Sequence, residues 1–308
     1  MRLAETSRRL NALSRLFALL LTRATFDPCE NKRSVFLNNE PHNGQSEVSV
    51  ASNVSYFLEH LSEYHDSVRD IDTYKTLHQF ISNEVAGVSE LLDIGNGGVF
   101  DYDTSRVGSI TAIDLFLGEL PPDVVAKYFP QNCRLIQGSA LALPEGDGKF
   151  DMVLMVMLIH HLTSTDWRSS WDNARLALDE AWRVLKPGGR LLIVESCVPW
   201  WFFRFEKPAL WLLSRSIKSV FSHPVTLQFP ASMIKAELEK KTDKVKMTEI
   251  PKGKFVLQFG FKVPSFLTPA MPFAFEAIKK EFASNAVTTS QFRAASSESP
   301  NEFPETRR

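Results

Sequence analysis

Short apolar runs separated by helix-like stretches fill the middle of the chain, and this alternation constrains the fold more than any other feature. The runs lie at Leu91–Ile94, Ile110–Ile113, Leu135–Ile136, Met152–Met157 and Leu191–Val194. They do not alternate apolar with polar residues, as is typical of strands buried on both faces. Helical patterns separate several of them, at Pro122–Phe129 and Asp166–Leu185. This order predicts an α/β fold with a mostly parallel sheet and helices on both faces.

The first two predicted strands end in residues suited to a nucleoside. Gly95 and Gly97 follow the first strand, where glycine permits a tight turn and close approach of a ligand to the backbone. Asp114 ends the second strand, where a carboxylate can accept hydrogen bonds from both ribose hydroxyls. Either feature alone has a structural explanation, namely a simple turn or a helix N-cap. Their combination indicates a nucleoside site.

The same turn disfavours a dinucleotide. In the pattern G-x-G-x-x-G, Gly95 and Gly97 match the first two glycines, but the third position is Phe100. A pyrophosphate resting on a helix N-terminus therefore fits poorly. The adenosyl group of a smaller cofactor without phosphate fits better.

With these residues in place, the chain from about Glu90 to Val194 resembles the class I S-adenosylmethionine-dependent methyltransferases, in particular the group that acts on small molecules. The matching motifs are Asp93–Gly97, Asp114, Gly138–Pro144, Phe150–Val153, Ile159–Leu162 and Arg183–Leu191. The most specific of them contains Lys186-Pro187-Gly188-Gly189. Its proline cannot extend the preceding helix, and its glycines turn the chain into the next strand.

The resemblance implies a Rossmann-like sheet of seven strands and S-adenosylmethionine as the cofactor. The residues expected to bind the cofactor are Asp93, Gly95, Asn96, Gly97, Asp114, Leu115, Ser139 and Ala140. Two positions depart from the family's pattern, because Val99 replaces a third glycine and Ser139 replaces an acid that contacts adenine. A serine hydroxyl still accepts a hydrogen bond but carries no charge. These departures leave weaker cofactor binding, or a noncatalytic relative, as alternatives.

His160 and His161 are the candidate catalytic residues. An imidazole beside the cofactor can remove a proton from an acceptor hydroxyl near neutral pH, whereas the alternative is a histidine that only holds its loop. Neither residue has a cysteine or a further histidine at metal-ligand spacing, so we expect no metal site. Glu195, at the end of the fifth strand, can bind a polar substrate group or a neighbouring loop.

An aromatic-rich insertion, about residues 197–229, follows the fifth strand and is the expected substrate lid. Trp200, Trp201 and Phe205 are the residues expected to enclose a hydrophobic or aromatic acceptor and exclude water. Extra core beneath a long crossover and a membrane-interface helix are the alternatives. After a helix at Pro230–Lys240, a closing hairpin is predicted to supply strands six and seven, at Val245–Ile250 and Phe255–Phe259.

The ends of the chain differ from its middle. Residues 1–48 are expected to form a leader and linker with an arginine-rich N-terminal helix, residues 49–282 the methyltransferase domain and residues 283–308 a flexible tail. A net charge of −1 disfavours nucleic acid as a partner. Three separated cysteines suit a reducing compartment, so a cytoplasmic protein is expected. The alternative is organelle targeting or peripheral membrane contact through the N-terminal helix.

Together these features predict methyl transfer from S-adenosylmethionine to a hydrophobic or aromatic small molecule, at oxygen. A nicotinamide-dependent oxidoreductase on a similar sheet and a noncatalytic binding module of this fold are the alternatives.

Overall fold

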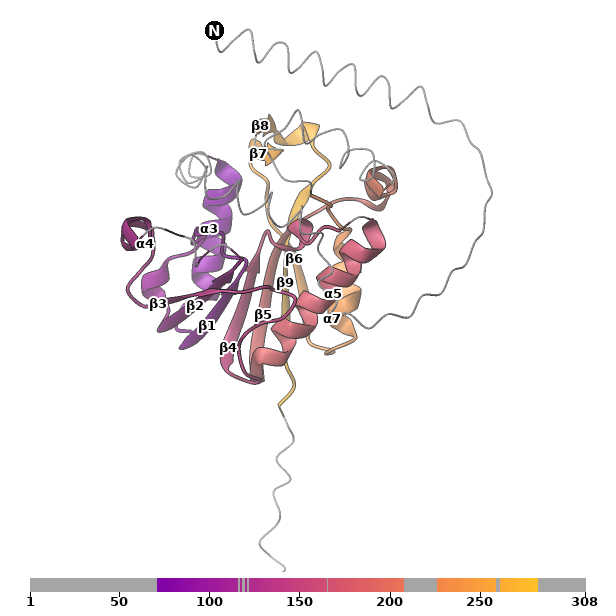
Figure 1. Ribbon diagram of the computed structural model, residues 1–308. Coiled ribbons are helices and arrows are strands. Elements are labelled where there is room, and N and C mark those ends of the chain that lie inside the picture. The colour runs from indigo at the N-terminus through magenta and orange to yellow at the C-terminus, as the bar shows by residue number, and fades with distance from the viewer. Residues whose placement is uncertain are drawn as a thin grey trace, which may run out of the picture. The chain divides into compact units, whose positions relative to one another are not determined.

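The computed structural model describes residues 71–281, except 116, 118–119, 121, 165, 208–225 and 259–260 (Figure 1). The leader and linker, the tail after residue 282 and the central part of the expected lid lie outside the described residues. Within the described part, none of the helices combines the length and apolarity needed to cross a membrane.

One sheet of seven strands forms the centre of the described region, in the order β3-β2-β1-β4-β5-β9-β6 (Figure 1). The strands are β1 (Glu90–Ile94), β2 (Ser109–Asp114), β3 (Cys133–Gln137), β4 (Phe150–Val156), β5 (Leu185–Cys197), β6 (Val245–Glu249) and β9 (Met271–Ile278). The first five pair in parallel, and β9 runs antiparallel to β5 and β6. The order reverses between β1 and β4, and ligands bind at the carboxyl ends of strands beside such a reversal. The predicted fold class is confirmed.

The prediction of the closing hairpin is wrong in its second strand. The predicted segment forms β7 (Phe255–Gln258), which pairs with β8 (Phe261–Pro264) in a separate two-stranded sheet. The seventh strand of the main sheet is instead β9, whose Phe275 pairs with Ile193 of β5 and with Met247 of β6. The physical reason is burial: Phe275 is fully buried, whereas Phe255 is 37% exposed.

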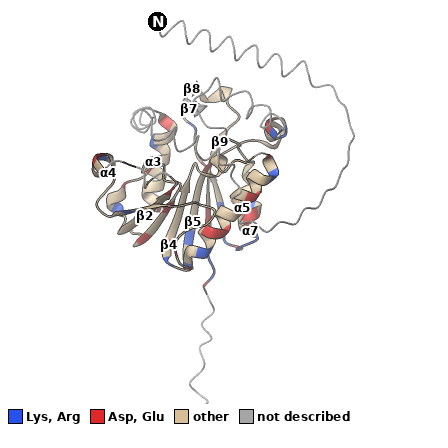
Figure 2. Cartoon of the chain, viewed as in Figure 1, with Lys and Arg blue, Asp and Glu red and all other residues tan. Residues whose placement is uncertain are grey.

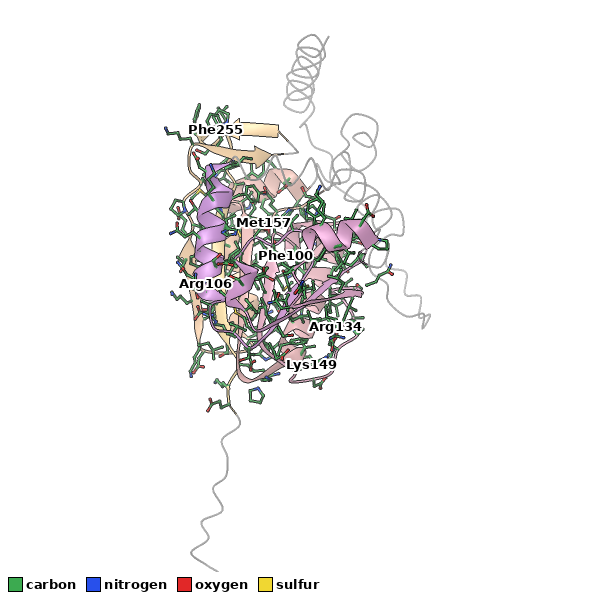
Figure 3. The ribbon with its side chains drawn as sticks, turned by 90° about the vertical axis from the view of Figure 1, so that its left-hand side faces the viewer. Phe100, Arg106, Arg134, Lys149, Met157 and Phe255 are labelled. Atoms are coloured by element: carbon green, nitrogen blue, oxygen red, sulfur yellow. The ribbon has the colours of Figure 1, made fainter. Side chains whose placement is uncertain are left out.

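The helices cover the two faces of the sheet. On one face, α3 (Asp72–Glu84) packs Leu77 and Ile81 against residues of β1, β2 and β4. On the other face, α5 (Trp167–Val184) and α7 (Ala231–Glu239) pack against alternate residues of the same sheet. Figure 1 shows α5 and α7 on the near side, and Figure 3 shows α3 on its own face. The helices predicted at Asp166–Leu185 and Pro230–Lys240 are confirmed to within one residue at each end.

Helix α5 leads directly into β5. Asp166 caps its start by accepting hydrogen bonds from the backbone N–H groups of Arg168, at 2.7 Å, and Ser169, at 3.2 Å. Acidic and basic residues are interleaved along the outer side of α5 (Figure 2), so this helix presents no field of one sign. The helix ends at Val184, and the Lys-Pro-Gly-Gly segment forms the irregular start of β5, where the register with β4 shifts.

The crossover from β1 to β2 is unusual. Parallel strands are commonly joined through an α-helix, but residues 95–108 contain only the short 3₁₀ helix η1 (Thr104–Arg106). The Arg106 guanidinium ties this crossover to α3 by donating to the Ser82 carbonyl at 3.2 Å and to Asn83 Oδ1 at 3.1 Å. Figure 3 shows Arg106 beside α3. The crossover is thus a compact loop clamped against a helix that precedes it in the chain.

Candidate functional site

The glycine turn after β1 lies at the carboxyl edge of the sheet. Gly95 and Gly97 have φ of +71° and +63°, in the left-handed region that favours glycine. A Cβ at Gly95 would collide with the side chain of Leu158, which follows β4. A Cβ at Gly97 would meet no atom within 4 Å. The turn therefore packs tightly against the β4 loop on one side and leaves open space beside Gly97.

Asp114 lies directly beside this turn. Its Oδ2 accepts a hydrogen bond from the Gly97 N–H at 3.1 Å, and its Oδ1 accepts one from the Leu115 N–H at 2.6 Å. Gln137, at the end of β3, donates to the Leu115 carbonyl at 2.9 Å. Three neighbouring strands thus hold the carboxylate in place. The structure brings together the glycine turn and the acid that the sequence analysis singled out.

Asp93 lies beneath the turn and is only 3% exposed. Its Oδ2 accepts hydrogen bonds from Asn96 Nδ2 at 2.7 Å and from the Tyr102 hydroxyl at 2.9 Å. Burial raises the pKa of Asp93 to about 7, although these two hydrogen bonds oppose the shift. Asn96 also receives a hydrogen bond from Gly98 N–H at 3.1 Å. Asp93 and Asn96 therefore brace the turn from inside.

The histidine pair lies on the 3₁₀ helix η3 (Ile159–His161), after β4. Glu195, which is buried at the end of β5, accepts a hydrogen bond from the Ile159 N–H at 2.7 Å and lies 2.5 Å from His160 Nδ1. The ring centroids of His160 and His161 are 4.3 Å apart. Of the two possibilities for Glu195, the structure shows the contact with a neighbouring loop. That contact orients His160 and fixes the loop that carries both imidazoles.

The expected lid begins with a helix at residues 200–207, and its inner and outer sides differ sharply. Phe203 is fully buried and packs its ring against Trp167 and Phe229 at 6.0 and 5.8 Å. The three aromatic residues expected to contact substrate are instead exposed, at 49% for Trp200, 59% for Trp201 and 71% for Phe205. Their contact with an acceptor stays a prediction.

Glu206, on the inner side of the same helix, was not singled out from the sequence. The backbone N–H of Gln228 donates to its carboxylate, and burial raises the pKa of Glu206 to about 8. Its Oε2 is buried and has no hydrogen-bond partner among the residues that the structure describes. The Gln228 side chain donates to Ser196 Oγ at 2.7 Å, which links this segment to the end of β5. Helix 200–207 is thus tied to the edge that carries Glu195.

Comparison with known proteins agrees with this geometry. Residues 92–193, which run from β1 to β5, match the family model described as a methyltransferase domain. These residues belong to the class I S-adenosylmethionine-dependent methyltransferases. The match covers the glycine turn, Asp114 and the histidine pair, so the family resemblance drawn from the motifs is confirmed.

Curated relatives of this methyltransferase domain are similar over part of their length. An uncharacterized methyltransferase of Schizosaccharomyces pombe is 33% identical over 40% of this chain and 45% of its own. A demethylmenaquinone methyltransferase of Tropheryma whipplei is 29% identical over 47% of this chain and 58% of its own. The chain thus spans about half the length of the curated relatives it matches.

A solved structure shares the fold of the methyltransferase domain. It is 1,6-didemethyltoxoflavin-N1-methyltransferase of Burkholderia thailandensis, with bound 1,6-didemethyltoxoflavin and S-adenosylhomocysteine. The two proteins are 15% identical, the match covers 80% of this chain and 94% of that one, and the TM-score is 0.50. At this identity the comparison supports the fold only.

The family's cofactor, S-adenosylmethionine, is compatible with the residues of the turn. Asp114 is partly exposed, and a carboxylate can accept several hydrogen bonds, including the two from the Gly97 and Leu115 N–H groups. The open space beside Gly97 permits close approach of a ligand. Ser139, which follows β3, uses its hydroxyl to accept the Leu141 N–H at 3.2 Å. In the described part of the chain, no three His, Cys, Asp or Glu side chains are grouped to hold a metal ion.

Proposed function

We propose that this protein transfers a methyl group from S-adenosylmethionine to a hydrophobic or aromatic small molecule. The single observation that carries the proposal is the contact between Asp114 and Gly97, because it joins a carboxylate and an open glycine turn at the reversal of strand order. When bound, S-adenosylmethionine supplies an electrophilic methyl group on a sulfonium sulfur.

The cofactor residues have two tasks in this proposal. Asp114 accepts hydrogen bonds from the ribose hydroxyls, and the Gly95–Gly97 turn makes room for the amino-acid part of the ligand. Leu115, Ser139 and Ala140 line the adenine side, since they follow β2 and β3 at the same edge. Binding in this way fixes one reactant, and fixing both reactants supplies much of the rate of a two-substrate reaction.

The acceptor is proposed to bind between the η3 loop and helix 200–207. His161 is the proposed base for an acceptor hydroxyl. It is preferred to His160 because the Nδ1 atom of His160 already contacts Glu195. Oxygen is the proposed acceptor atom. Carbon is the second choice, supported by a similar ubiquinone/menaquinone biosynthesis C-methyltransferase of Legionella pneumophila, 28% identical over 39% of this chain.

Two measurements test the proposal. Calorimetry with S-adenosylhomocysteine should show binding, and NADH should not bind, because Phe100 stands where a dinucleotide turn needs glycine. Incubation with isotopically labelled S-adenosylmethionine and a panel of phenols, hydroxyquinones and aromatic amines should then label at least one acceptor. NADH binding without S-adenosylhomocysteine binding would support the oxidoreductase instead. Cofactor binding without transfer to any acceptor, including those in a metabolite extract, would support the noncatalytic module.

A further inference from the structure

A cavity of about 700 Å³ lies between α3, the β1–β2 crossover and α4 (Pro122–Tyr128), next to the residues that follow the glycine turn. Its walls come from one side of α3, from residues 99–104 and from residues 127–130. Figure 3 shows Phe100 between the two helices. The volume is that of a small-molecule site. The space is open because the described crossover contains no α-helix to fill it.

Aromatic rings form much of the wall. The Phe100 ring meets Tyr102 and Phe129 edge to face, with centroids 5.8 and 5.6 Å apart, and Tyr128 lines the same space. The Lys127 ammonium already lies 4.7 Å from the centre of the Tyr128 ring. The faces of such rings carry negative potential and attract cations. The wall is therefore suited to a positively charged group.

Of the two acids on the wall, Asp101 is half-buried and Asp103 is exposed. Asp101 lines the cavity, and no hydrogen bond or ion pair to its carboxyl is found within the described residues. Burial raises the pKa of Asp101 to about 7. Asp103, also on the wall, is exposed and already accepts hydrogen bonds from the Ser105 N–H at 3.1 Å and its hydroxyl at 2.6 Å. Asp101 is half-buried, so its carboxyl is poorly hydrated and a cation that pairs with it would stabilise its charge.

We propose that this cavity binds an organic ammonium ion, with Asp101 as its counter-ion and the ring of Phe100 against its alkyl groups. Lys75, His78 and Lys127 also line the cavity, but they are exposed at its rim, where water screens their repulsion. Asp101 is half-buried, whereas these three residues are exposed, so Asp101 interacts more strongly with a charge at short range. This binding does not depend on methyl transfer.

The test compares choline with its neutral isostere 3,3-dimethylbutan-1-ol by calorimetry on the full chain at pH 8. Choline should bind at least tenfold more tightly than the alcohol. Asp101→Asn should weaken choline binding at least tenfold, and the matched Asp103→Asn should change it less than twofold. S-adenosylhomocysteine affinity, measured on the same samples, should be unchanged in both variants, which separates this proposal from the proposed function.

Equal binding of choline and the alcohol, or equal effects of the two aspartate changes, would overturn the proposal. Inorganic phosphate is the competing probe. If the wild type binds phosphate but not choline, and Lys127→Ala loses phosphate binding, the cavity binds anions through its rim and the proposal is wrong. If Asp101→Asn fails to fold, choline binding by Phe100→Leu is measured instead. Weaker choline binding by that folded variant supports the proposal, and unchanged binding refutes it.

Discussion

The buried carboxyl of Asp93 makes the stability of this protein depend on pH in a defined way. Burial raises its pKa from the ordinary 3.8 to about 7, so the folded state holds a proton that the unfolded chain releases. The free energy of unfolding is therefore unaffected by this group below pH 3.8. It falls as the pH rises from 3.8 to about 7, because the unfolded chain loses the proton first. A shift of this size corresponds to about 4 kcal/mol in total, of which roughly 3 kcal/mol falls between pH 5 and pH 8.

Asp93→Asn removes this dependence. The asparagine keeps an oxygen that can accept from Asn96 and Tyr102, and it cannot ionise. Relative to the wild type, the variant should therefore gain roughly 3 kcal/mol in free energy of unfolding between pH 5 and pH 8. Urea unfolding at pH 5, 6, 7 and 8 measures this, and contributions from other titrating groups cancel in the difference.

Asp166→Asn is the control, because the pKa of Asp166 is shifted in the opposite direction and the group titrates outside the assayed pH range. Its hydrogen bond with Ser169 lowers the pKa of Asp166, so its stabilisation is present at higher pH and is lost as the solution is acidified through the lowered pKa. The Asp166 variant should thus be less stable than the wild type by a constant amount from pH 5 to pH 8, and this deficit should shrink only when the solution is acidified below the ordinary pKa of 3.8. A difference between wild type and Asp93→Asn that stays constant from pH 5 to pH 8 would refute the reasoning.

Three further changes test the site. Asp114→Ala should weaken S-adenosylhomocysteine binding by about 100-fold or more, because hydrogen bonds to a charged group contribute about 1.5–3 kcal/mol each; calorimetry within threefold of the wild type would contradict this. His161→Ala should slow methyl transfer more than it weakens cofactor binding, and equal losses would leave His161 a structural residue. Glu206→Gln should raise the unfolding temperature relative to the wild type at pH 9 but not at pH 5, because burial raises the pKa of Glu206 to about 8. A difference in scanning calorimetry that is independent of pH would count against that assignment.

Local patterns in the chain were sufficient to predict the centre of the fold. Parallel strands buried on both faces leave continuous apolar runs, so β1, β2, β4 and β5 could be predicted without a structure. The turn at Gly95 and the acid at Asp114 follow two such strands directly. Because adjacent parallel strands end at the same edge, their meeting required only that β1 and β2 be neighbours.

Tertiary structure alone decided which distant side chains meet. No local signal links Tyr102 to Asp93, or Glu195 to His160, because each contact depends on how a loop folds back over the sheet. The seventh strand was misplaced for the same reason, since β9 is defined by pairing with β5 and β6 and not by the nearest turn. Apolar runs and glycine turns are formed by residues adjacent in sequence, so they can be recognised locally. Burial, strand pairing and side-chain hydrogen bonds arise only when separate segments pack together.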